Sequence, residues 1–177
     1  MKDIQAKFKI TEIEEQRKDL SFITILKEQA ISLITYLRDI KEYKHLVLLT
    51  AVDWIEDNHF QLTYLLNNPE KKSDIGVKVL IDRENPEMES IHHLWKQAKT
   101  YQRELREMFG INFPGSPKVD EPFILEGWTD IPPYRKDFDT KKYSEETYFP
   151  RPGRSTNDPA TYMKQKLYPD EQETYYI

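Results

Sequence analysis

Cysteine is absent from the 177 residues of this chain. The chain therefore offers no disulfide, no thiolate nucleophile and no thiolate ligand for a metal ion or an iron–sulfur cluster. No stretch approaches the ~18 apolar residues that a membrane-spanning helix needs, and the start of the chain lacks the apolar segment of a signal peptide. We therefore expect a cytoplasmic chain, soluble by itself, which meets a membrane only through a partner.

Positive charge is also in short supply. The chain has 26 lysines and arginines against 31 aspartates and glutamates, a net charge of −5 and an isoelectric point near 5.5. A partner with a phosphate backbone requires a basic face that releases counterions. Nucleic acid is therefore not expected as a partner.

The usual motifs of catalysis and cofactor binding are missing as well. The sequence contains no GxGxxG, GxxxxGK[ST] or GxSxG pattern, which removes the support for a nucleotide site or a hydrolase nucleophile. His92 and His93 are adjacent, so on a helix they diverge by about 100° and do not chelate one ion. We assign no catalytic, cofactor-binding or metal-binding residue.

The first half of the chain shows the patterns of strands and one amphipathic helix. The segment 20–26 is apolar and β-branched, as in a short strand, and segment 27–43 has helical periodicity. Strands are also predicted at 45–54, 59–66 and 76–82, the first two as a hairpin. The apolar residues at helical spacing are Ala30, Leu33, Ile34 and Leu37, and those that alternate in the middle strand are Phe60, Leu62 and Tyr64.

A second helix is predicted from Ile91 to about Phe109. Ser90 is placed to cap its start, and Gly110 falls where a left-handed residue ends a helix. The apolar residues that share one face of this helix are Leu94, Ala98, Tyr101, Leu105 and Met108, and those expected to seal its end are Ile111 and Phe113.

The composition changes after Gly110. Nine of the eleven prolines lie between 113 and 177, together with twelve of the twenty-two aromatic residues. Disordered tails are normally poor in aromatic residues, and burying half of these rings would hide on the order of 900 Å², about one side of a standard interface. We predict an α+β docking domain at 1–112, with a small mixed sheet and packed helices. A long extended C-terminal arm at 113–177, rich in proline and aromatic residues, would then bind partner subunits.

Two charged segments border this change. In the first, YQRELREMFGINFPG at 101–115, Arg106 and Glu107 are expected on a solvated helix face, and Arg103 is four residues before Glu107, a spacing that permits pairing. Glu104 lies at the margin of the apolar face and needs a cation or a peptide N–H.

The second charged segment is PPYRKDF, residues 132–138. Arg135 and Lys136 are adjacent on an extended backbone, so they point in opposite directions, one toward a carboxylate and one toward a partner. We predict a buried ion pair between Arg135 and Glu104, with a plain surface loop as the alternative.

The two segments together resemble the 30-kDa, or C-type, subunit family of NADH:quinone oxidoreductase (respiratory complex I) and its relatives in membrane-bound hydrogenases. The family motif reads roughly E-R-E-x-x-D-M-F-G-I-x-F-x-G-H-P, and this chain has Q-R-E-L-R-E-M-F-G-I-N-F-P-G-S-P from Gln102 to Pro117. The later family motif P-L-R-K-D-F/Y is similar to PYRKDF at 133–138. The motif residues that carry partner-binding or structural roles by this resemblance are Arg103, Glu104, Met108, Phe109, Gly110, Arg135, Lys136 and Asp137.

Three departures from the family pattern are visible. Gln102 replaces an acid, Ser116 replaces a histidine, and Asp120 with Glu121 stands near the place of an Arg-Arg pair in many members. These differences point to a hydrogenase-like or otherwise divergent branch.

The resemblance implies a non-catalytic assembly subunit on the cytoplasmic face of a membrane, in the peripheral arm of an ion-translocating oxidoreductase. Its implied partners are the large catalytic subunit, of the 49-kDa (D) type or the hydrogenase large-subunit type, and the small iron–sulfur subunit of the B type. Iron–sulfur clusters, with nickel–iron or quinone, would lie in those partners and no cofactor in this chain. The alternatives are a stand-alone adaptor of an unrelated complex and an acid–base enzyme that uses Glu104 and Asp137.

Overall fold

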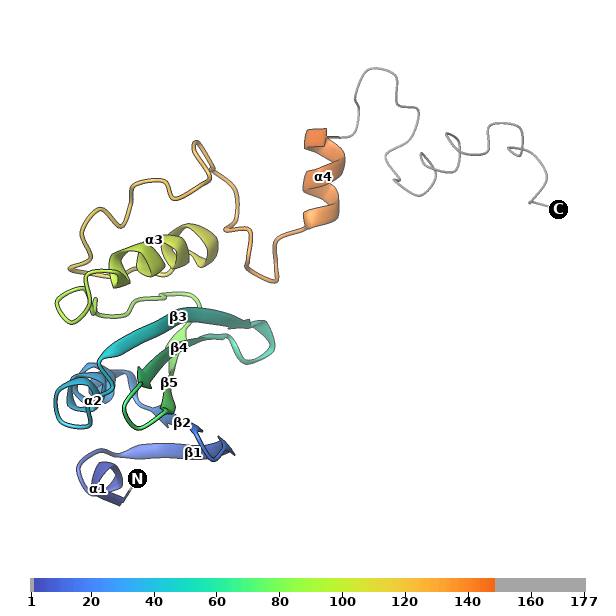
Figure 1. Cartoon of the computed structure of the whole chain (residues 1–177). Coiled ribbons are helices and arrows are strands. Elements are labelled where there is room, and N and C mark those ends of the chain that lie inside the picture. Colours follow the sequence, from blue (N-terminus) through green and yellow to red (C-terminus); the bar gives the residue numbers. More distant parts are fainter. Residues whose placement is uncertain (1, 149–177) are drawn as a thin grey trace, which may run out of the picture. The chain divides into compact units, whose positions relative to one another are not determined.

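The larger of two compact units is built on a five-stranded mixed sheet. The computed structural model describes residues 2–148 (Figure 1). The chain divides into the units Met1–Asp137 and Phe138–Ile177. The strands lie in the order β1-β2-β5-β4-β3, in which β2 and β5 are parallel and the other pairs antiparallel. The elements of this unit are α1 Lys2–Gln5, β1 Ile10–Arg17, β2 Leu20–Ile25, α2 Lys27–Asp39, β3 His45–Trp54, a 3₁₀ turn Ile55–Asp57, β4 His59–Asn68, β5 Ser73–Asp82 and α3 Ala98–Phe109. The predicted α+β class with a mixed sheet is confirmed, although β1 and α1 were not expected.

The hairpin of β3 and β4 forms as predicted. Its strands pair from Trp54 with His59 onward, and Asn58 takes the left-handed conformation that closes the turn. Along β4 every second residue is buried, which confirms the alternation read from the sequence.

One face of the sheet carries the core. The buried residues of β4 stand opposite buried residues of β3 and β5, and the buried sides of α2 and α3 belong to the same core. The four residues of α2 expected on its inner side are all buried: Ala30, Leu33, Ile34 and Leu37. Within residues 2–148 no helix is long and apolar enough to cross a bilayer.

The helix α3 is shorter than predicted. It begins at Ala98, while residues 91–97 form turns, in which the Trp95 N–H donates to the Ile91 carbonyl at 3.1 Å. Ser90 does accept a hydrogen bond from the N–H of His92 at 3.1 Å, so it stabilises these turns and not the helix. Ala98, Leu105 and Met108 are buried as expected.

The predicted arm starts inside the first unit. Residues 113–137 belong to the same compact unit as the sheet, and their role as a partner-binding arm stays a prediction. In the second unit, Asp139 caps α4 (Thr140–Tyr148) by accepting the N–H of Lys142 at 2.9 Å. The aromatic residues Phe149, Tyr162, Tyr168, Tyr175 and Tyr176, part of the predicted arm, lie outside the described residues.

Candidate partner-binding site

The chain turns sharply where α3 ends. Gly110 has a φ of +78°, and its N–H donates to the carbonyl of Arg106 at 3.1 Å. Such a φ strains any residue with a Cβ, which explains the glycine. Beyond it, Ile111 and Phe113 are fully buried, and Asn112 bridges to the segment before α3: its N–H donates to the Pro86 carbonyl at 2.8 Å. The prediction that a left-handed Gly110 ends the helix and that Ile111 and Phe113 seal this end is confirmed.

The polar side of α3 holds the chain as it returns. The carboxylate of Glu107 accepts the backbone N–H groups of Phe123, Ile124 and Leu125 at 2.6, 2.9 and 3.1 Å. Glu107 was predicted on a solvated helix face, but its carboxylate is bound to the chain's own backbone. A carboxylate that receives several N–H donors forms strong, charge-assisted hydrogen bonds, so this turn of the returning segment is fixed to the helix.

Two arginines of α3 contact the same returning segment. Arg103 donates to the carbonyl of Pro122 at 3.1 Å, and Arg106 pairs with Asp120 at 3.0 Å. The predictions for these residues were therefore incomplete, because the side chains of α3 bind a segment 14 to 19 residues further along the chain.

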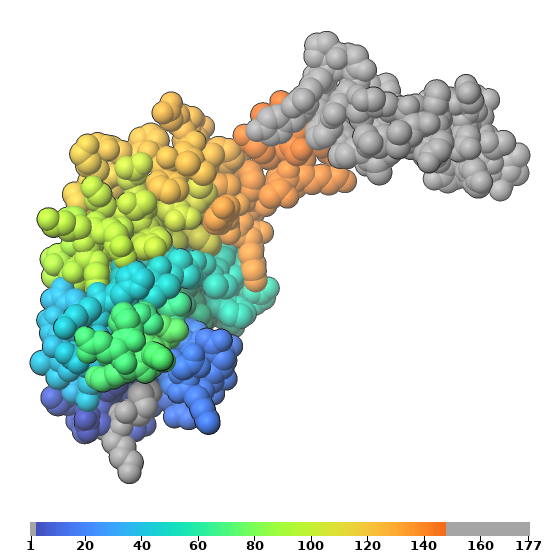
Figure 2. Space-filling view, viewed as in Figure 1, coloured from blue at the N-terminus to red at the C-terminus, as the bar shows by residue number. Residues whose placement is uncertain are grey.

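The returning segment displays apolar side chains to solvent. Ile124, Ile131 and Tyr134 are 66%, 40% and 58% exposed, and we call these three residues the apolar ridge. Tyr134 is held from behind, because its N–H donates to the Met108 carbonyl at 3.0 Å and its ring meets that of Phe109 edge-on. Figure 2 shows the segment, in gold, on the outside of the molecule beside α3. Rigidly held, exposed apolar side chains are typical of a surface that binds a protein partner.

The second charged segment is fixed by a network of ion pairs at the ends of β3 and β5. Asp53 accepts two hydrogen bonds from Arg83, at 2.8 and 3.1 Å, and a third from the Lys136 N–H at 2.8 Å. Arg83 also pairs with Asp137 at 2.7 Å, while Arg135 donates to the Arg83 carbonyl at 3.1 Å.

The predicted partner of Arg135 was wrong. The ion pair with Glu104 does not form: Arg135 lies over the ring of Phe60 and beside Asp137. The carboxylate of Glu104 has no ion pair or hydrogen bond within residues 2–148. Lys136 meets Glu56 at 3.4 Å. The backbone is not extended as predicted: it forms turns here, and the Arg135 N–H donates to the Pro132 carbonyl at 3.1 Å.

Electrostatics explains why the network stays ionised. Asp53 is only 3% exposed, and burial alone would raise its pKa, but the hydrogen bonds from Arg83 and the Lys136 N–H outweigh burial and hold the pKa of Asp53 below its ordinary value. The hydrogen bond to Asp53 in turn raises the pKa of Arg83. Both groups are therefore charged at neutral pH, and their ion pair stabilises the fold.

The family follows from comparison with known proteins. A family model described as the respiratory-chain NADH dehydrogenase, 30 Kd subunit, matches residues 23–144. The chain belongs to this family. A C-type subunit of the NADH-quinone oxidoreductase of Moorella thermoacetica is 31% identical over 138 residues, which cover 78% of this chain and 92% of that protein. The family resemblance read from the two charged segments is confirmed.

Two further proteins that are similar to this chain are informative. A C/D-type subunit of the NADH-quinone oxidoreductase of Hydrogenobaculum is 31% identical over 81% of this chain but only 24% of its own length. A chain in the solved structure of the membrane-bound sulfane sulfur reductase, an archaeal respiratory membrane complex, superimposes with a TM-score of 0.73 and 27% identity, over 83% of this chain and 88% of that chain.

The structure shows the contacts of two residues that depart from the family motif, Gln102 and Asp120. Gln102 is fully buried and accepts a hydrogen bond from Ser90 at 2.9 Å, where a carboxylate would need a compensating charge. Asp120 pairs with Arg106, so an arginine in its place would repel that side chain. Sequence reasoning missed the burial of Gln102 because a polar residue on the apolar side of a helix gives no signal of its partner.

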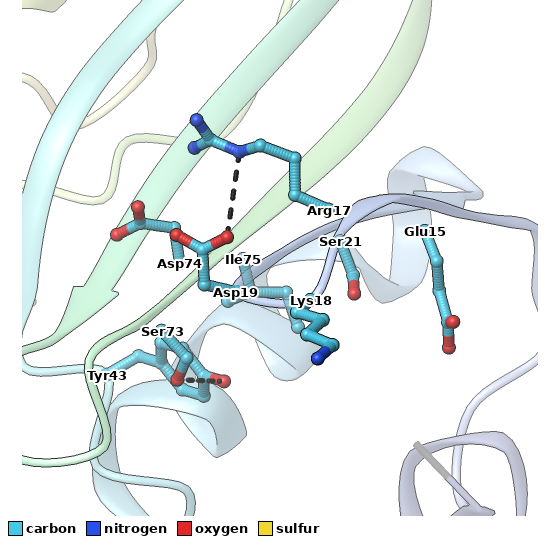
Figure 3. A pocket seen from close by; sticks show the side chains of 9 residues that line it. All are labelled: Glu15, Arg17, Lys18, Asp19, Ser21, Tyr43, Ser73, Asp74 and Ile75. Atoms are coloured by element: carbon cyan, nitrogen blue, oxygen red, sulfur yellow. Dashed lines mark hydrogen bonds and ion pairs between the residues drawn. The ribbon is translucent and has the colours of Figure 1, made fainter.

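Within residues 2–148 no group of three His, Asp or Glu side chains is placed to hold a metal ion. A polar hollow lies between the β1–β2 turn and the start of β5 (Figure 3); four of its lining residues form pairs, Arg17 with Asp19 at 3.6 Å and Tyr43 with Ser73 at 3.1 Å.

Proposed function

We propose that this chain is a non-catalytic assembly subunit in the peripheral arm of a complex I-like, membrane-bound, ion-translocating oxidoreductase. Its partners would be a large catalytic subunit of the 49-kDa (D) or hydrogenase type and a small iron–sulfur subunit of the B type. The redox cofactors would reside in those partners, at the cytoplasmic face of the membrane. The C/D-type relatives, in which a region similar to this chain is part of a much longer protein, support a neighbour of the first kind.

One observation carries the proposal: α3 fixes the returning segment through Arg103, Arg106 and Glu107 and leaves the apolar ridge exposed. Because Arg103 and Glu107 bind the chain's own backbone and Arg106 binds Asp120, these three side chains serve to hold a surface rather than to react with a substrate. A fixed surface loses little conformational entropy on binding, as a scaffold between redox subunits requires.

The test is purification of the tagged chain from its native host. Mass spectrometry and metal analysis of the co-purifying proteins would distinguish a nickel-containing partner from a quinone-reducing one. We expect Ile124→Asp with Ile131→Asp to abolish co-purification, because two charges would enter the apolar interface. Ile40→Asp, on an isoleucine that is 63% exposed just after α2, is the control and should leave co-purification intact. Equal recovery of partners with all variants would refute the proposal.

Two other functions make different predictions. A stand-alone adaptor would co-purify with proteins that hold no redox cofactor. An acid–base enzyme using Glu104 and Asp137 would be active as the isolated chain. This second alternative is disfavoured by the contacts of Asp137, whose carboxylate is paired with Arg83 at 2.7 Å.

A further inference from the structure

The sheet has a second face that no helix of the first unit covers. Residues of β3 and β5 that point away from the core remain exposed: Leu48, Val52, Trp54 and Leu80 are 39%, 40%, 40% and 44% exposed. The register places Val52, Gln61 and Leu80 in one row across β3, β4 and β5. Toward β2 this face is covered by its own side chains, because the ring of Phe22 lies on Gly76 and Lys78 lies over that ring. The exposed apolar residues are therefore concentrated at the β3 side.

The strand β3 is also an edge of the sheet (Figure 1). Its beginning is protected: side chains of Trp95, Gln97 and Tyr101 donate hydrogen bonds to the carbonyls of Lys44, Leu46 and Val47, respectively. From Leu48 to Trp54, the outward backbone groups of β3 have no hydrogen-bond partner within residues 2–148. An unprotected edge beside exposed apolar side chains is the form of surface that accepts an added strand.

The charge at the far end of β3 indicates what such a strand carries. Four exposed acidic residues follow the ends of the strands here: Glu56 and Asp57 in the turn after Trp54, and Asp82 and Glu84 at and after the end of β5, where the register puts Asp82 in the same row as Trp54. Within residues 2–148 Lys136 lies over the Trp54 ring at 5.7 Å and pairs with one of these residues, Glu56, at 3.4 Å. Arg83 does not offset this charge, because Asp53 and Asp137 bind it. The excess of negative charge is complementary to a cationic side chain.

We propose that the free edge of β3, from Leu48 to Trp54, binds an extended strand of a partner protein. The strand would place alternate apolar side chains beside Leu48 and Val52 on the exposed face of β3, and a lysine or arginine against the acidic end at Trp54. This surface is separate from the apolar ridge, and the inference rests on the proposed function only for the presence of a partner subunit.

The experiment places a photo-crosslinking amino acid at position 52 of the full tagged chain in its native host, with position 26 as the control. Leu26 is similarly exposed, at 47%, but precedes α2 away from β3. We expect position 52, and not position 26, to crosslink to one partner segment, whose peptide sequence alternates apolar residues and contains a lysine or arginine. A crosslink to a second copy, to residues 149–177 of the same chain, or to a partner segment without this pattern would overturn the inference, as would no crosslink.

A second measurement tests the charge. Asp57→Lys with Asp82→Lys should lower recovery of the crosslinked partner about 2- to 5-fold for each charge, because exposed ion pairs contribute modestly. Glu12→Lys with Glu15→Lys, on exposed residues of the opposite edge strand β1, should leave recovery unchanged. Absence of any partner from the wild-type preparation would refute the proposed function, whereas a partner that co-purifies without contacting position 52 would refute this inference alone.

Discussion

Asp53 joins three parts of the first unit through one carboxylate. It lies near the end of β3 and accepts hydrogen bonds from Arg83, just after β5, and from the backbone of Lys136. Replacing it by asparagine keeps the shape but leaves Arg83 with one fewer buried anion. We expect Asp53→Asn to lower the free energy of unfolding by about 2–4 kcal/mol, measured by urea denaturation at neutral pH. Asp57→Asn, at an exposed position, is the control and should change it little; equal effects would contradict the role assigned to Asp53.

The depressed pKa of Asp53 predicts a pH dependence with a definite sign. A carboxyl group whose folded pKa lies below its unfolded value, about 3.9, stabilises the protein above the unfolded pKa and loses this effect as the pH falls through the folded pKa. The stability difference between wild type and Asp53→Asn should therefore be constant above about pH 5 and shrink at lower pH. Parallel stability curves down to pH 2.5 or so would show that the pKa is not depressed.

Gly110 combines a left-handed backbone with close packing. A Cβ at this position would meet Pro132 Cγ at 3.3 Å, whereas at Gly127, with a similar φ of +73°, it would meet nothing within 4 Å. We expect Gly127→Ala to cost about 1 kcal/mol through backbone strain and Gly110→Ala to cost more, because Pro132 must also move. Thermal unfolding of both variants measures the difference; equal costs would mean that Pro132 yields freely.

Sequence reasoning found Gly110 but not Arg83. The glycine is marked locally, since it directly follows a helical apolar pattern. Arg83 has no local signal: its carboxylate partners are 30 and 54 residues away along the chain, and pairing over such distances depends on the register of β3, β4 and β5. The same reason explains why Arg135 was given Glu104, the nearest carboxylate at the edge of an apolar face, as its partner.

The helices and strands that could be predicted are those whose apolar residues follow a clear helical or alternating spacing. The helix α2 and the strand β4 are amphipathic by themselves, so their spacing alone predicts them. The edge strand β1 is rich in glutamate and largely exposed, and it forms because β2 offers a partner. The start of α3 was placed seven residues early, since apolar residues of the preceding turns continue the helical spacing by chance.

Glu107 is the residue through which helix α3 positions the returning segment at 123–125. Its carboxylate satisfies three successive backbone N–H groups at 123–125. We expect Glu107→Ala to raise the amide hydrogen-exchange rates of these residues by a factor of about 10 or more, because each hydrogen bond to a charged group contributes roughly 1.5–3 kcal/mol. Exchange in β4 should not change, since its hydrogen bonds lie within the sheet.

Glu107→Gln provides the matched variant. Its amide oxygen retains one acceptor in the same place but no charge, so an intermediate exchange rate is expected at 123–125. If alanine and glutamine at position 107 leave the exchange of these amides as slow as in the wild type, the segment is held by its apolar contacts and not by the carboxylate.

At the scale of the whole molecule, sequence composition and packing place the domain boundary at different residues. The prolines begin to cluster at Pro114, which suggested an arm from residue 113, but the compact unit continues to Asp137 because α3 and the Asp53 network bind residues 120–137. Composition reports the lack of regular structure in this segment, whereas packing depends on individual polar contacts that composition does not reveal.

A chain ending at residue 137 separates folding from assembly. All the contacts of the Asp53 network and of Glu107 lie within residues 2–137, so the truncated chain should unfold in urea with the same midpoint as the full chain. If residues 138–177 bind partner subunits, as the proposed function requires, the truncated chain should nevertheless be recovered with fewer partner proteins from the native host. A lower midpoint would show that the C-terminal residues stabilise the first unit. Full recovery of partners at an unchanged midpoint would confine the partner-binding surface to residues before 138.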